Sequence, residues 1–140
     1  SMQDSTDTSV RTVSGLPAGS VTNPPLFDMD RNIVVAYDSA NAYLAAWRFD
    51  AALRAFTLLW TKKKFGCASH MVLFRQTGQI AVNDYRERGE EVVVLDIETG
   101  AELGRVRTGG ITQGVVFPSV GWGRDFYWSS MGRLARVFVA

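Results

Sequence analysis

Residues 73–110 read LFRQTGQIAVNDYRERGEEVVVLDIETGAELGRVRTGG. Four short apolar runs alternate with polar turns in and just before this stretch, at 71–74, 79–84, 91–97 and 103–108. The third run contains VVVL at 92–95, which is typical of a strand that is buried on both faces. A charged turn is expected at 86–90, and Gly100 stands where a tight hairpin needs positive φ. The stretch therefore predicts four short antiparallel strands joined by hairpins.

The same pattern occurs about three times along the chain. LFDMDRNIVV at 26–35 aligns with LFRQTGQIAV at 73–82, an offset of 47, and a third copy begins near Phe117. Four strands in roughly 45 residues are the blade of a β-propeller, so the sequence predicts an all-β propeller segment. The expected blades lie at about 22–65, 66–109 and 110–140, after a tag remnant and a flexible N-terminus at 1–9.

One stretch of the first copy allows a rival interpretation. Residues 40–60 are rich in alanine and place polar side chains at helical spacing, so propensity alone favours an amphipathic helix. The repeat register instead requires two strands, at 43–49 and 55–62. We adopt the two strands as the prediction.

The third copy predicts only three strands, at 114–117, 124–129 and 134–140. Residues 9–14 alternate polar and apolar side chains and can supply the fourth strand from the other end of a ring. Closed propellers have at least four blades, and an open arc leaves apolar faces in water. Pairing of two chains, further blades in a longer chain, and collapse into a smaller sandwich all stay open. The apolar run at the end of the sequence favours the first two.

Composition limits the function classes. The net charge of +1 is spread along the chain, and the run from Lys62 to Lys64 is interpreted as a solvated strand edge, so no nucleic-acid surface is predicted. No apolar run approaches the roughly 18 residues of a membrane span, and no signal peptide is recognised, so the compartment stays undetermined. The single cysteine, Cys67, excludes an intrachain disulfide and a cysteine-cluster metal site.

The repeat register places Asn23, His70 and Gln113 just before the first strand of each copy. In a propeller these positions converge at the mouth of the central channel, where ligands gather. His70 is the only histidine, and it is the candidate for acid–base work or metal ligation. A histidine that bonds a backbone carbonyl is the more common alternative, and no metal site is predicted.

A second candidate cluster lies at 83–86 and contains Asp84 and Arg86, with Asp38 near the equivalent point of the first copy. These side chains can bind a polar ligand, or they can satisfy their own turn, which is the interpretation that we favour. Asp96 is predicted to be structural, as the residue whose carboxylate bonds the amides of its hairpin.

The aromatic residues divide into two groups. Trp47, Trp60 and Trp128 lie within apolar runs and are expected to pack between blades. Trp122 lies in a loop between two glycines and is a candidate for ligand binding. Cys67 precedes His70 by three residues, but no third residue that would orient a nucleophilic pair is evident.

The sequence VVVLDIETG at 92–100 is similar to the third-strand hairpin of quinoprotein-like and YVTN-type propeller repeats. The resemblance extends over about 26–140 and is most specific in the second copy. It implies a propeller and leaves the function open, because such repeats occur in oxidoreductases, hydrolases, lyases and binding modules. No quinone-cofactor residues carry over, since the chain has no cysteine pair and no matching carboxylate cluster, and the cofactor is undetermined.

The leading hypothesis is a non-catalytic propeller module that binds a protein partner or a small ligand at the channel mouth. It is expected to associate with itself or with further blades. The alternative is a propeller-type enzyme, a hydrolase or an oxidoreductase, that uses His70 with carboxylates from adjacent blades or a second chain.

Overall fold

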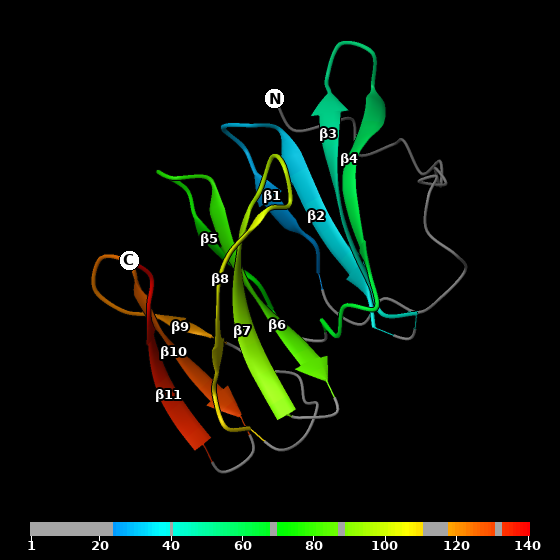
Figure 1. Ribbon diagram of the computed structural model, residues 1–140. Helices are drawn as coiled ribbons and strands as arrows, with labels where there is room; N and C mark the ends of the chain where they lie inside the picture. The colour runs from blue at the N-terminus through cyan, green and yellow to red at the C-terminus, as the bar shows by residue number, and fades with distance from the viewer. Residues whose placement is uncertain (1–23, 40, 68–69, 87–88, 111–117, 131–132) are drawn as a thin grey trace.

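The computed structural model describes residues 24–39, 41–67, 70–86, 89–110, 118–130 and 133–140; the side chains of Arg86 and Ser130 lie outside this description. In this part of the chain all regular structure is β, arranged as three antiparallel sheets (Figure 1). The two strands predicted within 40–60 are both present, so the helical alternative is wrong for that stretch. Pairing with neighbouring strands outweighs the helical propensity of alanine there.

Each sheet is a meander of consecutive strands. Sheet A contains β1 (Leu26–Asp28), β2 (Ile33–Asp38), β3 (Tyr43–Asp50) and β4 (Ala55–Lys63). Sheet B contains β5 (Val72–Phe74), β6 (Gln79–Arg86), β7 (Gly89–Asp96) and β8 (Glu102–Arg107). Sheet C contains β9 (Ser119–Val120), β10 (Asp125–Ser130) and β11 (Arg133–Phe138). Within every sheet, neighbours in sequence are neighbours in space.

The repeat seen in the sequence is present in the backbone, with a small correction. The first strands end at Asp28, Phe74 and Val120, at intervals of 46 residues rather than 47. Sheets A and B also share an irregularity, because the pairing of the third strand with the fourth shifts at Ala46/Trp47 in one and at Val94/Leu95 in the other. The two complete sheets are therefore copies of one unit in detail.

Two predicted boundaries need correction. The strand that pairs with β10 is β9, where Val120 pairs with Phe126, whereas the predicted strand at 114–117 lies outside the described residues. The charged turn expected at 86–90 is shorter than predicted, because Arg86 pairs with Gly89 at the end of β6 and β7. Glu90 consequently belongs to a strand.

The core lies on both faces of sheet B. One cluster joins sheets A and B and includes Ile33, Val35, Leu44, Ile80, Val82, Val93 and Leu95. The other joins sheets B and C and includes Val72, Ala81, Val92, Phe126, Trp128 and Val137. Adjacent residues of β6 and β7 thus face opposite neighbours, which confirms the prediction of two-sided burial for 92–95. Trp47 is buried but belongs to neither cluster.

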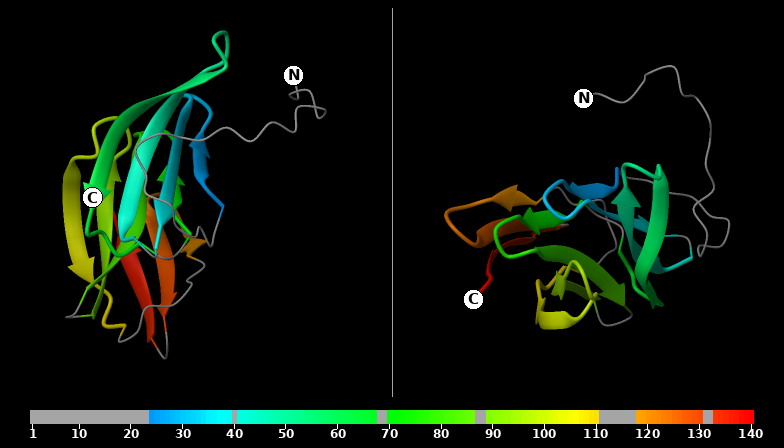
Figure 2. Two further views of the ribbon diagram at one scale, coloured as in Figure 1. Left: turned by 90° about the vertical axis from the view of Figure 1, so that its right-hand side faces the viewer. Right: turned by 90° about the horizontal axis from the view of Figure 1, so that it is seen from above.

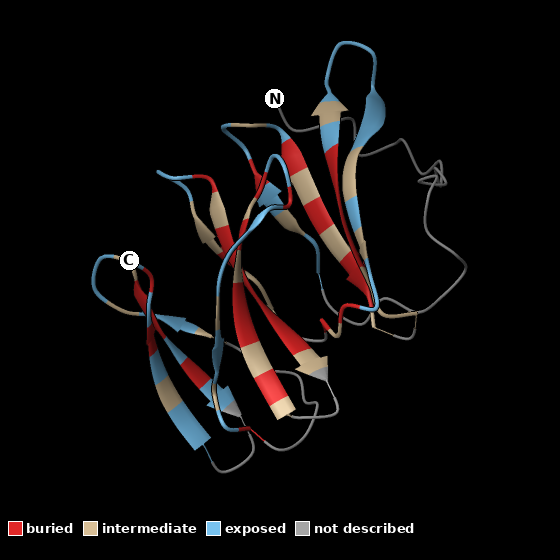
Figure 3. Ribbon diagram, viewed as in Figure 1, coloured by how far each residue is buried: buried red, intermediate tan, exposed pale blue. Residues whose placement is uncertain are grey.

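The sheets follow one another in chain order. Seen from above, sheet B lies between sheets A and C (Figure 2). The first strands of sheets A and B, β1 and β5, are in contact. Burial is concentrated on the middle strands, whereas β8 is exposed along most of its length (Figure 3).

Candidate functional site

The predicted channel-mouth residues can be placed only in part. His70 is half-buried just ahead of β5. Asn23 and Gln113 lie outside the described residues, as does the side chain of Arg86. The convergence of Asn23, His70 and Gln113 around one axis therefore stays a prediction.

Asp84 is a strand residue whose carboxylate is fully buried in β6. One oxygen accepts the backbone N–H of Gly66 at 2.8 Å, and the other accepts Nη1 of Arg105 at 2.8 Å. These two bonds reach the segment before β5 and the outer strand β8, beyond the turn that Asp84 was expected to satisfy. Asp38 does behave as predicted, since its carboxylate accepts both the backbone N–H and the side-chain amide of Asn41.

Arg105 gathers three carboxylates on the surface of sheet B. Its Nη1 lies 2.8 Å from Asp84 and 2.6 Å from Glu91, and its Nη2 lies 2.8 Å from Glu102. The hydrogen bond to Glu102 is the largest cause that raises the pKa of Arg105 above its ordinary value. The same contact lowers the pKa of Glu102. The guanidinium and its carboxylates satisfy one another, and the cluster ties β6, β7 and β8 together.

Glu90 is the most unexpected buried group. Its side chain is 1% exposed, and its carboxylate accepts Nε1 of Trp128 at 3.0 Å, Oγ1 of Thr108 at 3.2 Å and Nδ2 of Asn83 at 3.4 Å. Burying a carboxylate is costly unless donors replace its water, and three neutral donors do so here. Because Trp128 belongs to β10, this network links sheet B to sheet C.

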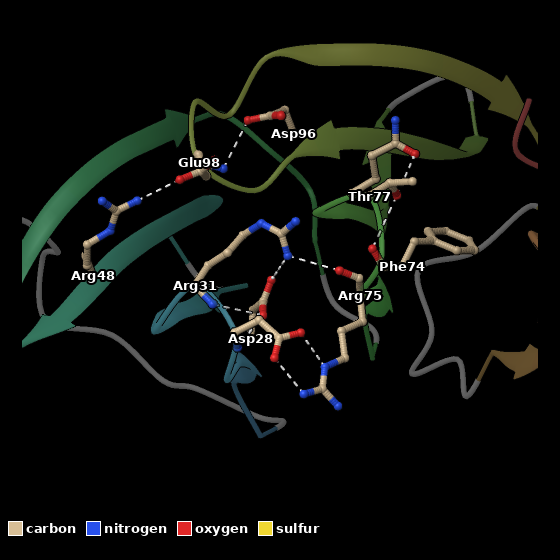
Figure 4. Close-up of polar contacts among 10 residues, drawn as sticks. Asp28, Arg31, Arg48, Phe74, Arg75, Thr77, Asp96 and Glu98 are labelled. Carbon is tan, nitrogen blue, oxygen red and sulfur yellow. Dashed lines mark hydrogen bonds and ion pairs between the residues drawn. The ribbon is translucent and has the colours of Figure 1, made fainter. Parts of the chain in front are cut away.

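Opposite charges also join sheets A and B at the turns that follow β1 and β5 (Figure 4). Arg31 donates from Nη1 to the Asp28 carboxylate at 2.9 Å and to the backbone carbonyl of Arg75 at 3.0 Å. Arg75 in turn holds Asp30 through two hydrogen bonds, of 2.5 and 2.6 Å. This contact lowers the pKa of Asp30, chiefly through the hydrogen bond. The charged groups of this cluster therefore bind sheet A to sheet B.

The outer face of sheet C, formed by Tyr127, Leu134 and Phe138, has no neighbouring sheet in the described structure. These residues alternate with inward-facing residues of the B–C cluster, and Leu134 and Phe138 are 73% and 70% exposed. Asp125 and Ser129 lie on the same face, and Arg136 lies between Leu134 and Phe138 along β11, with its Nε 2.6 Å from Asp125. Three large side chains on one sheet face, Tyr127, Leu134 and Phe138, are thereby exposed to solvent.

Trp122 adds to the exposed aromatic surface of this sheet. It lies in the turn between β9 and β10 and is 93% exposed. Its neighbour Gly121 cannot be replaced without movement, because a Cβ there would lie 2.3 Å from the Asp125 carboxylate. Close packing of Gly121 thus fixes the turn that presents Trp122.

An apolar groove of about 280 Å³ lies between β8 and the end of β11; we call it the β8–β11 groove. Its lining includes the apolar residues Val92, Val94, Leu103, Val106, Val137, Phe138, Val139 and Ala140. Sheets A and B have a fourth strand, whereas in the described part of sheet C the third strand, β11, pairs only with β10. The groove therefore lies beside a strand edge that has no partner strand within the described part of the chain.

Comparison with known proteins adds no identity: no family model matches the sequence, and no curated protein matches it. Among the described residues, no three His, Cys, Asp or Glu side chains are grouped so that they could hold a metal ion. The same residues contain no helix that could span a membrane.

Proposed function

We propose that this chain is a segment of a β-propeller and acts as a non-catalytic module that binds a protein partner. The propeller assignment is supported by three successive meanders that stack face to face in chain order. It is also supported by the contact between β1 and β5, since the first strands of propeller blades surround a common axis. The ring is completed by further sheets from another chain or from a longer one.

The proposal of protein binding rests on the exposed side chains on the outer face of sheet C. Sheet B provides the internal comparison, because its corresponding side chains are covered by a neighbouring sheet on each face. Contiguous exposed apolar surface marks interaction sites, and aromatic residues are enriched in them. The partner that fits this face is a protein with an apolar sheet face of its own.

The other possibilities have less support. A small ligand at the channel mouth depends on Asn23 and Gln113, which lie outside the described residues. The enzyme alternative needs carboxylates that act together with His70. Asp84, however, is bound to Arg105 and Gly66.

Two matched substitutions test the proposed face. Leu134→Glu places a charge on the outer face of sheet C, and Leu53→Glu places the same charge in the β3–β4 hairpin, where the leucine is 76% exposed. Capture from the cells that produce the chain should retain a stoichiometric protein with the unmodified chain and with Leu53→Glu. Leu134→Glu should lose it. Equal retention by all three chains would contradict the proposal, and circular dichroism confirms that each variant is folded.

A further inference from the structure

We infer that Arg136 binds a carboxylate of the protein that covers the outer face of sheet C. The inference rests on the proposed function and adds the chemistry of the partner, which is an apolar protein face with an aspartate or glutamate near its centre. Arg136 supplies the polar contact of this interface, and the apolar side chains around it supply most of the buried area.

The pairing of β10 with β11 places Arg136 in the middle of the outer face. Three cross-strand pairs form this face, namely Ser129 with Leu134, Tyr127 with Arg136, and Asp125 with Phe138. Arg136 and Tyr127 are the central pair. Binding energy is concentrated near the centre of protein interfaces, and arginine and tyrosine are enriched among the residues that provide it.

Asp125 holds Arg136 in place through one nitrogen only. Its Oδ2 accepts Nε of Arg136 at 2.6 Å, and the aspartate side chain is 2% exposed whereas that of the arginine is 63% exposed. Nη1 and Nη2 of Arg136 have no hydrogen-bond or ion-pair partner among the described residues. A planar guanidinium can bind a carboxylate through two parallel hydrogen bonds from such a pair of nitrogens. The exposed edge of Arg136 therefore fits a second carboxylate.

Sheet B shows that one guanidinium of this protein can bind several carboxylates. Arg105 contacts Asp84, Glu91 and Glu102, and its side chain is 24% exposed. Arg136 contacts one carboxylate and is much more exposed. A carboxylate from a bound protein would give Arg136 the kind of environment that Arg105 has within the chain.

The charge of sheet C favours an acidic partner. Residues 118–140 have a net charge of +2, whereas the whole chain has +1; their charged residues are Arg124, Asp125, Arg133 and Arg136. Two of these arginines are turned toward sheet B, since Arg124 donates to Gln79 and Arg133 lies beside Gly109. Arg136 is therefore the arginine of this sheet that a protein on the outer face meets, and the complementary group is negative.

NMR spectroscopy with 3-phenylpropionate tests the inference on the unmodified chain. This probe carries one carboxylate beside an apolar ring, and 3-phenylpropionamide is its uncharged counterpart. The carboxylate probe should shift the Nε–H signal of Arg136 and the backbone amide signals of β10 and β11, with a dissociation constant on the order of 1–10 mM. The amide probe should leave these signals unchanged.

Arg107 is the internal control for the NMR measurement, because its side chain is 60% exposed and pairs with Glu91 at 3.4 Å. Its Nε–H signal should move less than that of Arg136. Equal shifts at the two arginines, equal shifts with the two probes, or no shift at Arg136 would each overturn the inference.

Arginine variants test the same contact with the protein that is captured on the outer face. Arg136→Gln should weaken its binding at least about thirtyfold, because a carboxylate buried in the interface loses its charged partner. Arg136→Lys keeps the charge but cannot donate two parallel hydrogen bonds, and it should weaken binding about three- to tenfold. Arg107→Gln is the matched control and should bind within about twofold of the unmodified chain.

A double variant separates this contact from folding. Arg136→Gln leaves the buried Asp125 without its ion pair, whereas Asp125→Asn/Arg136→Gln replaces both charges with neutral amides of similar shape. The double variant should keep the far-UV circular dichroism of the unmodified chain and lose the partner as Arg136→Gln does. Binding of the double variant at unmodified strength would contradict the inference.

The outcomes distinguish this inference from the proposed function. A protein that is lost with Leu134→Glu but retained by the folded Arg136 variants would overturn the carboxylate contact and leave the binding face standing. A protein that is retained with Leu134→Glu would overturn the proposed function, and the inference with it.

Discussion

Replacing Trp128 with phenylalanine tests the bond that joins sheets B and C. The indole Nε1 lies 3.0 Å from the Glu90 carboxylate, and both side chains are buried. A hydrogen bond to a charged group contributes about 1.5–3 kcal/mol to stability, and the smaller ring loses about 1 kcal/mol of packing. Trp128→Phe should therefore lower the free energy of unfolding by about 2.5–4 kcal/mol.

Trp60→Phe is the matched control, because the Trp60 indole donates to a neutral carbonyl, that of Ile97, at 2.9 Å. A neutral bond contributes about 0.5–1.5 kcal/mol, so this variant should lose about 1–1.5 kcal/mol less than Trp128→Phe. Urea unfolding followed by far-UV circular dichroism measures both, since fluorescence changes with each tryptophan removed. In a Glu90→Gln background the cost of Trp128→Phe should fall by about 1 kcal/mol. If the two Trp→Phe variants lose equal unfolding free energy, and the loss for Trp128→Phe is unchanged in the Glu90→Gln background, a charged hydrogen bond between Trp128 and Glu90 is refuted.

Two further predictions concern substitutions in sheet B. Gly100→Ala should lower the free energy of unfolding by about 2–4 kcal/mol, because Gly100 has a φ of +71° and a Cβ would lie 2.7 Å from Trp60. The control is Gly104→Ala, where a Cβ would have no atom within 4 Å, and it should be close to neutral in the same urea assay. Arg105 lowers the pKa of Glu102, so this pair stabilises the fold above the unfolded pKa of about 4 and the contribution is lost as the pH falls. Glu102→Gln should lose under about 1 kcal/mol at pH 7, because Glu102 is partly exposed, and should show a shallower decline in unfolding free energy between about pH 5 and pH 3. A decline as steep as that of the unmodified chain would contradict it.

The strands could be predicted because their ends are set by local chemistry. The Asp96 carboxylate accepts the backbone N–H groups of Glu98 and Thr99, as predicted, and Gly100 has positive φ. The hairpin of sheet A has the same form without its sequence signature: Arg54 adopts a φ of +50° where sheet B has Gly100. The local sequence pattern is therefore sufficient to predict the strands of the second copy. In the first copy only the repeat register favours strands over a helix.

The polar clusters could not be predicted, because their partners are distant in sequence. Glu90 bonds Trp128, 38 residues away, and Asp84 bonds Arg105, 21 residues away. Whether Glu90 lies in a turn or in a strand depends on the exact pairing of Arg86 with Gly89. A shift of one residue reverses which face a side chain occupies, and composition does not determine it. The available signal was that Glu90 continues the alternation of residues 92 and 94 on the face turned toward sheet C.

The two interfaces between sheets follow one design, and it explains why the outer face of sheet C differs. At each interface an apolar centre is accompanied by an indole that donates to the neighbouring sheet, Trp60 to Ile97 in one and Trp128 to Glu90 in the other. Such a polar bond fixes how two sheets align, while the apolar centre supplies most of the free energy. The outer face of sheet C offers the apolar part, with Leu134 and Phe138, and among the described residues no further sheet lies against it. A protein that binds this face would need a polar contact of its own to fix its alignment, the role that an indole performs at the first two interfaces.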